Sequence, residues 1–125
     1  MKFEQLKSYL LDKPETTMEF PFGPDVNVFK VKGKMFALIG WKDDKMNMNL
    51  KCDPDESVAL RDIFFSIKPG YHMNKKHWIT IYFDEEKYGP LPPEGEILRL
   101  IDNSFRLVVS KMPKSQQRSI RVHEG

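Results

Sequence analysis

One short segment, residues 69–78, carries the densest set of side chains able to do chemistry. Its sequence, PGYHMNKKHW, holds two histidines, two lysines, two aromatic residues and an asparagine, and no acid. Cationic side chains contact phosphates, and aromatic rings stack on bases or support cations. The segment therefore suggests a nucleic-acid contact, for which the candidate residues are Tyr71, His72, Asn74, Lys75, Lys76 and His77.

The same residues also admit a purely architectural interpretation. Trp78 then lies in the core, the two lysines are simply solvated, and Pro69-Gly70 only shapes a turn. In either case we expect Asn74 and His72 to fix an irregular turn through hydrogen bonds from side chain to backbone. The sequence alone leaves both interpretations open.

Acidic residues are absent from two stretches of the chain. None occurs between Asp62 and Asp84 or between Asp102 and Glu124, although the net charge is only +2. If these stretches meet in space, one face of the molecule is basic and suits a polyanion such as DNA. Lysines of a predicted hairpin tip and of the last helix extend this expected surface: Lys30, Lys32, Lys34 and Lys111.

Catalysis and metal binding find little support in the sequence. His72 and His77 are five residues apart, a spacing that suits neither one helix face nor a strand pair, and no carboxylate or thiolate completes a metal site. Ser66 lies in no nucleophile motif, and no glycine pattern predicts a phosphate cradle. Cys52 is the only cysteine, so an internal disulfide is excluded. We predict a protein that is not an enzyme and needs no metal or cofactor.

The elements that position these residues follow from hydrophobic periodicity. Helical spacing predicts a helix over residues 2–13, ended by Pro14, and another from residue 94 to about 112. A capping sequence, Asp53-Pro54 with Glu56, predicts a third helix, running to about residue 65. Alternation predicts strands at residues 26–31, 35–41 and 46–51 in a meander, and residues 77–83 predict a strand inside the sheet.

This order of elements predicts an α+β domain, with helices against an antiparallel sheet of three strands in a meander plus one or two more. Proline and glycine predict irregular chain at residues 15–25 and an acidic loop at residues 84–96. Residues 1–114 form the expected domain, and residues 115–125, polar and without periodicity, an expected mobile tail.

Location and partners are less defined by the sequence. No apolar run approaches the roughly 20 residues of a membrane-spanning helix, and the N-terminus does not resemble a signal peptide, so we expect a cytoplasmic protein. DNA is the expected partner. A protein partner is the alternative, bound by the sheet or by apolar residues of predicted loops: Phe20, Phe22 and Trp41. The oligomeric state cannot be predicted.

Four blocks of the chain, VFKVKGKMFALIG, MNLKCDP, PGYHMNKKHWITI and IDNSFRLVVSKMPK, occur in this order. Together they resemble the MmcQ/YjbR family of small bacterial proteins over residues 1–114. The resemblance implies an α+β domain similar to secretion chaperones, with two wing-like elements and a DNA-binding role, and it carries over no catalytic residue. The positions that match the family pattern are residues 69–78, Lys30, Lys34, Phe36, Ser104 and Lys111.

Overall fold

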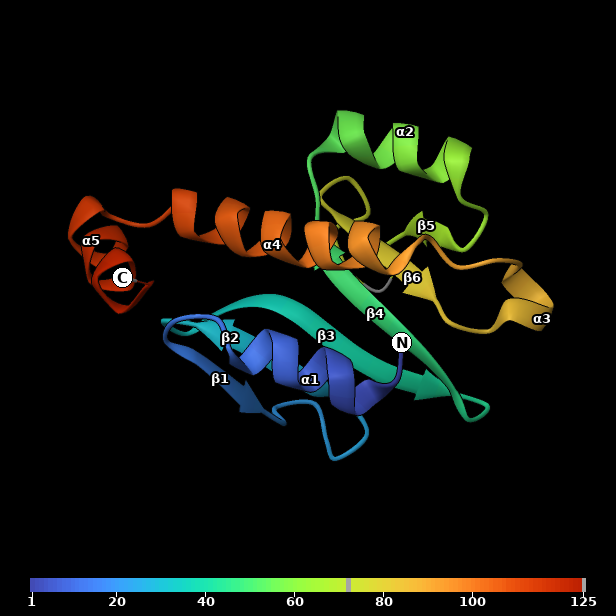
Figure 1. Ribbon diagram of the computed structural model, residues 1–125, viewed down its shortest axis with the longest axis horizontal. Coiled ribbons are helices and arrows are strands. Elements are labelled where there is room, and N and C mark those ends of the chain that lie inside the picture. Colours follow the sequence, from blue (N-terminus) through green and yellow to red (C-terminus); the bar gives the residue numbers. More distant parts are fainter. Residues whose placement is uncertain (72, 125) are drawn as a thin grey trace.

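The computed structural model describes residues 1–71 and 73–124, with side chains described as far as Arg121. Six strands form one antiparallel sheet in the order β1-β2-β3-β4-β6-β5 (Figure 1). The strands are β1 (Thr16–Glu19), β2 (Asn27–Val31), β3 (Lys34–Lys42), β4 (Lys45–Lys51), β5 (Ile67–Pro69) and β6 (Trp78–Tyr82). The helices of the described residues are α1 (Phe3–Leu11), α2 (Pro54–Ile63), α3 (Glu85–Tyr88), α4 (Glu94–Ser110) and α5 (Lys114–Glu124).

The meander β2-β3-β4 forms as the sequence predicts. Lys32 and Gly33 have φ values of 48° and 78°, which is the positive-φ pair of a hairpin turn. Asp43 and Asp44 repeat this pattern between β3 and β4, with φ values of 53° and 63°. The chain then passes through α2 and the short edge strand β5 before β6 pairs with β4, so β6 lies inside the sheet as expected.

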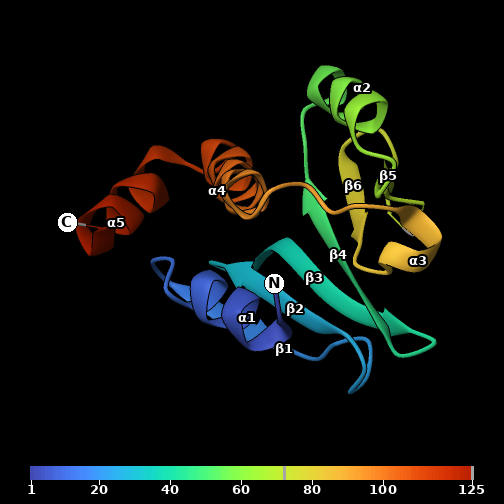
Figure 2. The same ribbon diagram turned by 45° about the vertical axis from the view of Figure 1, so that its right-hand side comes forward.

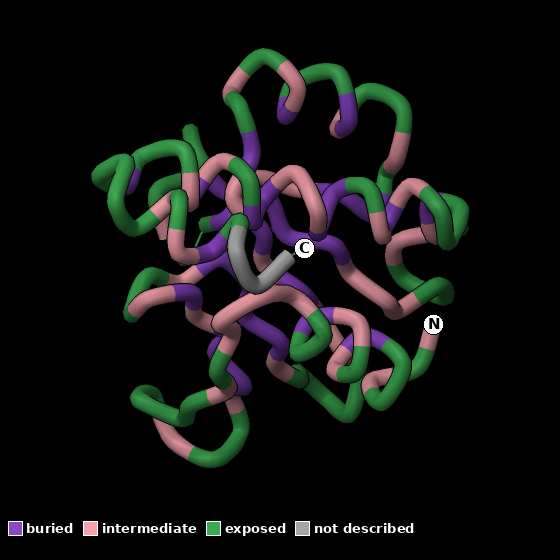
Figure 3. Tube along the Cα trace, turned by 60° about the vertical axis from the view of Figure 1, so that its left-hand side comes forward, coloured by how far each residue is buried: buried purple, intermediate pink, exposed green. Residues whose placement is uncertain are grey.

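Helices α1 and α4 cover one face of the sheet. Leu6 and Leu10 of α1, together with the apolar stripe of α4, join the core-facing residues of the strands in one buried cluster. Figure 2 shows both helices on the same side of the curved sheet, and Figure 3 shows the buried chain between helices and strands. Burial of this cluster, at roughly 25 cal/mol per Å² of apolar surface, is the main stabilising term.

Ser104, in the middle of α4, joins the helix to two strands. Its hydroxyl donates to the carbonyl of Phe36 at 2.6 Å and accepts from the backbone N–H of Lys51 at 2.8 Å. Phe36 and Lys51 are the chain neighbours of Ala37 and Leu50, which pair in the β3-β4 ladder. The hydroxyl therefore links β3 to β4 beside this pair. Two residues earlier in α4, Asp102 accepts a hydrogen bond of 2.7 Å from the Tyr9 hydroxyl, which fixes α1 against α4.

Three elements differ from the sequence-based expectation. Residues 16–19, predicted to be irregular, form β1 along β2, because the prolines flank the strand rather than interrupt it. The predicted acidic loop contains α3, which Asp84 caps by accepting from the Lys87 N–H. The segment that begins at residue 114 is the helix α5, with Ile120 buried in the core. The segment expected to be a mobile tail is therefore helical, while its mobility and the domain boundary stay predictions.

Gly70 allows the chain at the start of the segment 69–78 to lie close to strand β6. Its N–H donates to the carbonyl of Trp78 at 2.8 Å, which closes the pairing of β5 with β6. A Cβ at this position would lie 2.8 Å from the Trp78 Cβ, so only glycine allows this approach. Trp78 is itself buried with Val28 and Leu38 in a small cluster on the face opposite α1 and α4. Its ring is a core element and not a stacking platform.

Candidate functional site

Cationic side chains from separate parts of the chain surround the segment 73–78. Two hollows lie next to each other there and share Pro54 in their linings. The first, of about 320 Å³, is lined by Lys51 at the end of β4 and Lys111 after α4, with Asn74 and His77 between them. The second is lined by Arg61, Lys75 and Lys76, with Tyr71. We call the six basic residues of these hollows the cationic surface: Lys51, Arg61, Lys75, Lys76, His77 and Lys111.

Asn74 holds this turn in the way that the sequence suggests. Its side-chain Oδ1 accepts from the Lys76 N–H at 3.1 Å, and its carbonyl accepts from the His77 N–H at 3.0 Å. The turn leaves Lys75 and Lys76 exposed. His72, the other residue predicted to fix the turn, lies outside the described residues.

The charge of the cationic surface is partly offset. Asp53 and Asp55, at the start of α2, line the same two hollows. Asp53 is engaged as the helix cap and accepts from the N–H groups of Asp55 and Glu56. In the described part of the chain, none of the basic residues of this surface lies within ion-pair distance of a carboxylate. The summed charge of the residues that line the two hollows is therefore positive, and direct ion pairs among the described residues do not neutralise it.

The hairpin lysines do not belong to this surface, and the expectation that they would join it is wrong. Lys30 pairs with Glu19 at 3.3 Å, and Lys32 pairs with Glu15 at 2.9 Å. Both carboxylates come from β1 or its approach, the segment whose structure the sequence did not predict. Lys34 is exposed beside them, and the β2-β3 turn lies far from the start of β6 in Figures 1 and 2.

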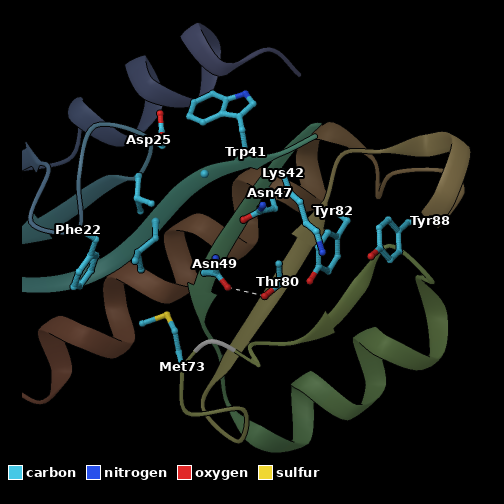
Figure 4. A pocket seen from close by; sticks show the side chains of 13 residues that line it. Phe22, Asp25, Trp41, Lys42, Asn47, Asn49, Met73, Thr80, Tyr82 and Tyr88 are labelled. Atoms are coloured by element: carbon cyan, nitrogen blue, oxygen red, sulfur yellow. Dashed lines mark hydrogen bonds between the residues drawn. The ribbon is translucent and has the colours of Figure 1, made fainter. Parts of the chain in front are cut away.

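The face of the sheet opposite α1 and α4, which we call the open face, carries a cleft that the sequence did not suggest. Its volume is about 570 Å³, and Figure 4 shows side chains from β3, β4, β6 and two loops around it. Asn47 and Asn49 of β4 and Thr80 of β6 form its floor with Leu38 and Gly40. The remaining lining residues are Phe22, Asp25, Val26, Trp41, Lys42, Met73, Tyr82 and Tyr88.

The polar groups of the floor are neutral amides and a hydroxyl. Thr80 is buried and donates to Asn49 Oδ1 at 2.6 Å, which leaves the Asn49 Nδ2 as a donor. The side chain of Asn47 has no hydrogen-bond partner among the described residues, so its amide offers both a donor and an acceptor. Gly40 provides room, because a Cβ there would meet its neighbours only at 3.8–4.0 Å.

Aromatic rings close one end of the cleft. Tyr82 of β6 stacks on Tyr88 of α3, with ring centroids 4.3 Å apart and planes inclined by 16°. Burial, and then the neighbouring Tyr88 and Tyr71, raise the pKa of Tyr82, so its phenol stays protonated at neutral pH. At the rim, Phe22 is 61% exposed. Trp41, which also lines the cleft, packs edge-on against Phe3 of α1 with ring centroids 5.1 Å apart.

Three other properties concern nucleophilic reactivity, metal binding and membrane insertion. Burial raises the pKa of the Cys52 thiol to about 12, so this cysteine is a poor nucleophile at neutral pH. Among the described residues, His, Cys, Asp and Glu form no group of three suited to a metal ion. The helices that the structure describes are too short or too polar to span a membrane.

The fold and the two surfaces define an α+β domain built around an open antiparallel sheet. The sequence profile named YjbR matches residues 11–107, and the chain belongs to this family. A protein of Escherichia coli named uncharacterized protein YbdF is 42% identical over 118 residues, which cover 94% of this chain and 93% of that protein. Uncharacterized protein YjbR of Escherichia coli is 27% identical, with 94% and 96% covered.

Two solved structures share the architecture. A Deinococcus radiodurans protein described as carrying a DUF419 domain superposes with a TM-score of 0.82 at 35% identity, covering 94% of this chain and 86% of that one. A Pseudomonas syringae protein superposes with a TM-score of 0.70 at 34% identity, covering 86% of this chain and 98% of that one. The names of these relatives state no activity.

Proposed function

We propose that this protein binds DNA through phosphate contacts made by the cationic surface, and that its role is binding rather than catalysis. One observation carries the proposal. Lys51, Lys75, Lys76 and Lys111 come from β4, the 73–78 turn and the end of α4, yet they line two adjoining hollows without a carboxylate partner within ion-pair distance among the described residues. Ammonium groups in such an arrangement suit successive phosphates of a strand.

The binding should be weak and strongly dependent on salt. Asp53 and Asp55 lie in the same hollows and reduce the local potential. Few phosphates are neutralised, and log K falls with log salt by about 0.7 per phosphate for single strands and about 0.9 for duplexes. The β2-β3 hairpin takes little part in this binding, because Lys30 and Lys32 are already paired with Glu19 and Glu15.

The test is fluorescence anisotropy of a labelled oligonucleotide at several salt concentrations between about 50 and 200 mM, the range over which phosphate contacts change affinity most visibly. Replacement of Lys75 and Lys76 by alanine should weaken binding and flatten the salt slope by about 1–2 units. The matched control is Lys30→Ala with Lys32→Ala, which removes the same charge at the hairpin and should leave the slope unchanged. Equal slopes for the wild type and the Lys75/Lys76 variant would remove the proposed surface.

A protein partner is the second candidate, because Phe20 and Phe22 are 48% and 61% exposed on the β1-β2 loop beside the cleft. Large exposed apolar side chains next to each other mark interaction surfaces more often than isolated ones do. Binding of a purified partner that is insensitive to salt and lost in Phe22→Ala would favour this function over DNA.

A further inference from the structure

The cleft on the open face has the features of a site for a small organic group. Its volume of about 570 Å³ lies within the range of roughly 300–1,000 Å³ that is typical of small-molecule sites. Such sites combine apolar walls with a few polar groups that fix the orientation of the ligand. Here Leu38, Val26 and Met73 give the apolar part, and the amides of Asn47 and Asn49 give the polar part.

The floor of the cleft favours a ligand whose edge is uncharged and carries hydrogen-bonding groups. Asn47 presents an unpartnered donor and acceptor side by side, and Thr80 directs Asn49 so that its Nδ2 remains available. Neither group carries a charge, and the nearest charges in the lining, Asp25 and Lys42, have opposite signs. A ligand edge with an adjoining donor and acceptor satisfies such amides, whereas a carboxylate or an ammonium group finds no counter-charge on the floor.

Aromatic heterocycles carry that kind of edge on a flat apolar ring. An asparagine amide forms a two-bond pair with the amino group and the neighbouring ring nitrogen of adenine. The stacked Tyr82 and Tyr88 and the exposed Phe22 supply the aromatic surroundings in which bases are held. These features match the way in which sheet surfaces bind unstacked bases of single strands.

The cleft is also connected to the cationic surface. Met73, which points toward the cleft in Figure 4, is two residues from Lys75 in the same turn. Two residues of extended chain span at most about 7 Å. A base in the cleft and a phosphate on the cationic surface can therefore belong to the same short stretch of a strand.

We infer that the open-face cleft binds an unstacked adenine base of single-stranded DNA, with Asn47 pairing its edge. The strand that supplies this base rests on the proposed function, because the cationic surface holds its phosphates. Recognition of the base itself depends on other residues, so the two ideas can be tested apart. Since a free nucleoside has no phosphate, it reports on the cleft alone.

The first measurement is an NMR titration of the full chain with adenosine and with purine riboside, which carries a hydrogen in place of the amino group. Adenosine should give saturable shifts at Asn47, Asn49 and Tyr82, and purine riboside should bind more weakly by roughly 5–150-fold, the range for one two-bond base contact. Absence of saturable adenosine shifts at the cleft, or equal binding of purine riboside, overturns the inference.

Variants give the second measurement. Asn47→Ala should weaken adenosine binding by a similar factor, and Gly40→Val should block it by filling the cleft from a position where a Cβ is tolerated. Gly40→Ala is the matched control, and it should change affinity less than twofold. Unchanged far-ultraviolet and amide spectra establish that each variant is folded, and Asn47→Ala alone decides the test if Gly40→Val does not fold. Unchanged adenosine binding by folded Asn47→Ala and Gly40→Val proteins contradicts the inference.

An oligodeoxyadenylate separates the two ideas. Salt-dependent binding that needs Lys75 and Lys76 but is indifferent to Asn47→Ala overturns the cleft inference and keeps the proposed function. Adenosine binding in the cleft without any oligonucleotide binding overturns the proposed function and keeps the base site as a nucleoside site. Loss of oligonucleotide affinity in both sets of variants supports both.

Discussion

Replacement of Ser104 by alanine tests how the central helix is held on the sheet. The Ser104 side chain is fully buried, and its hydroxyl makes two hydrogen bonds, 2.6 Å to the Phe36 carbonyl and 2.8 Å from the Lys51 N–H. Without the hydroxyl, a carbonyl and an amide lose a partner, and an unsatisfied buried group costs about 1–3 kcal/mol. Because Lys51 is only half-buried, a water molecule can accept from its N–H in the variant, which offsets part of the loss.

The expected net loss is therefore about 2–3 kcal/mol, after a helix-propensity gain of about 0.5 kcal/mol for alanine. Urea unfolding followed by circular dichroism measures it, with an unchanged m-value as a check on two-state behaviour. Ser110→Ala is the control, since that exposed hydroxyl on the same helix bonds only to the Leu107 carbonyl, and its effect should stay within about 0.5 kcal/mol. Equal unfolding free energies for the two variants would refute the bridging role.

Three further predictions concern packing, titration and capping. Gly70→Ala should destabilise by about 1–3 kcal/mol in urea unfolding because of the close approach to β6, whereas Gly95→Ala, with open space around it, should be neutral or stabilising. Burial and then the Asp102 hydrogen bond raise the pKa of Tyr9 from 10.0 to about 12. The stability that this gives is complete below pH 10 and lost as the pH rises to 12, so Tyr9→Phe should show a shallower alkaline decline of the unfolding free energy. Asp53→Ala should cost about 1 kcal/mol in thermal or urea unfolding through loss of the α2 cap, and a cost equal to that of an exposed surface substitution would contradict the capping role.

Much of the architecture was predictable because it rests on local patterns. The alternation of β4, the Lys32-Gly33 turn and the Asp53 cap each depend on residues close in sequence, and all three form as predicted. Strand β1 is short and helix α5 is polar, so they depend on partners distant in the chain, β2 and the core around Ile120. Single-sequence patterns carry no information on such partners.

The same distinction explains the functional surfaces. The sequence predicted that Asn74 fixes its turn and that Lys75 and Lys76 project from it, as the structure has them. It did not predict the ion pairs of the hairpin lysines, because their acidic partners lie on or beside the unexpected strand β1. The alternation of β4 placed Asn47 and Asn49 on one face. Only the pairing of β4 with β6 brings Thr80 beside them and creates the floor of a cleft.

Residues distant in the sequence also determine which aromatic side chains are buried and which are exposed. Trp78 is buried by residues from β2 and β3, and Trp41 is held against Phe3 of α1. Phe22 remains exposed although it lies among prolines, a setting in which aromatic side chains often cover a core. The aromatic side chains that line the cleft on the open face are Phe22, Trp41, Tyr82 and Tyr88, of which Trp41 is also held by Phe3.

DNA binding by the cationic surface and the cleft is tested most directly by an amide-resolved NMR titration of the full chain with a short oligodeoxyadenylate at low salt. Shifts should appear in two connected regions, residues 73–77 with Lys111 and the cleft floor at Asn47 and Asn49, and should disappear as salt rises. Shifts centred on the hairpin at residues 30–34, or no saturable shifts in either region, would show that DNA does not bind there.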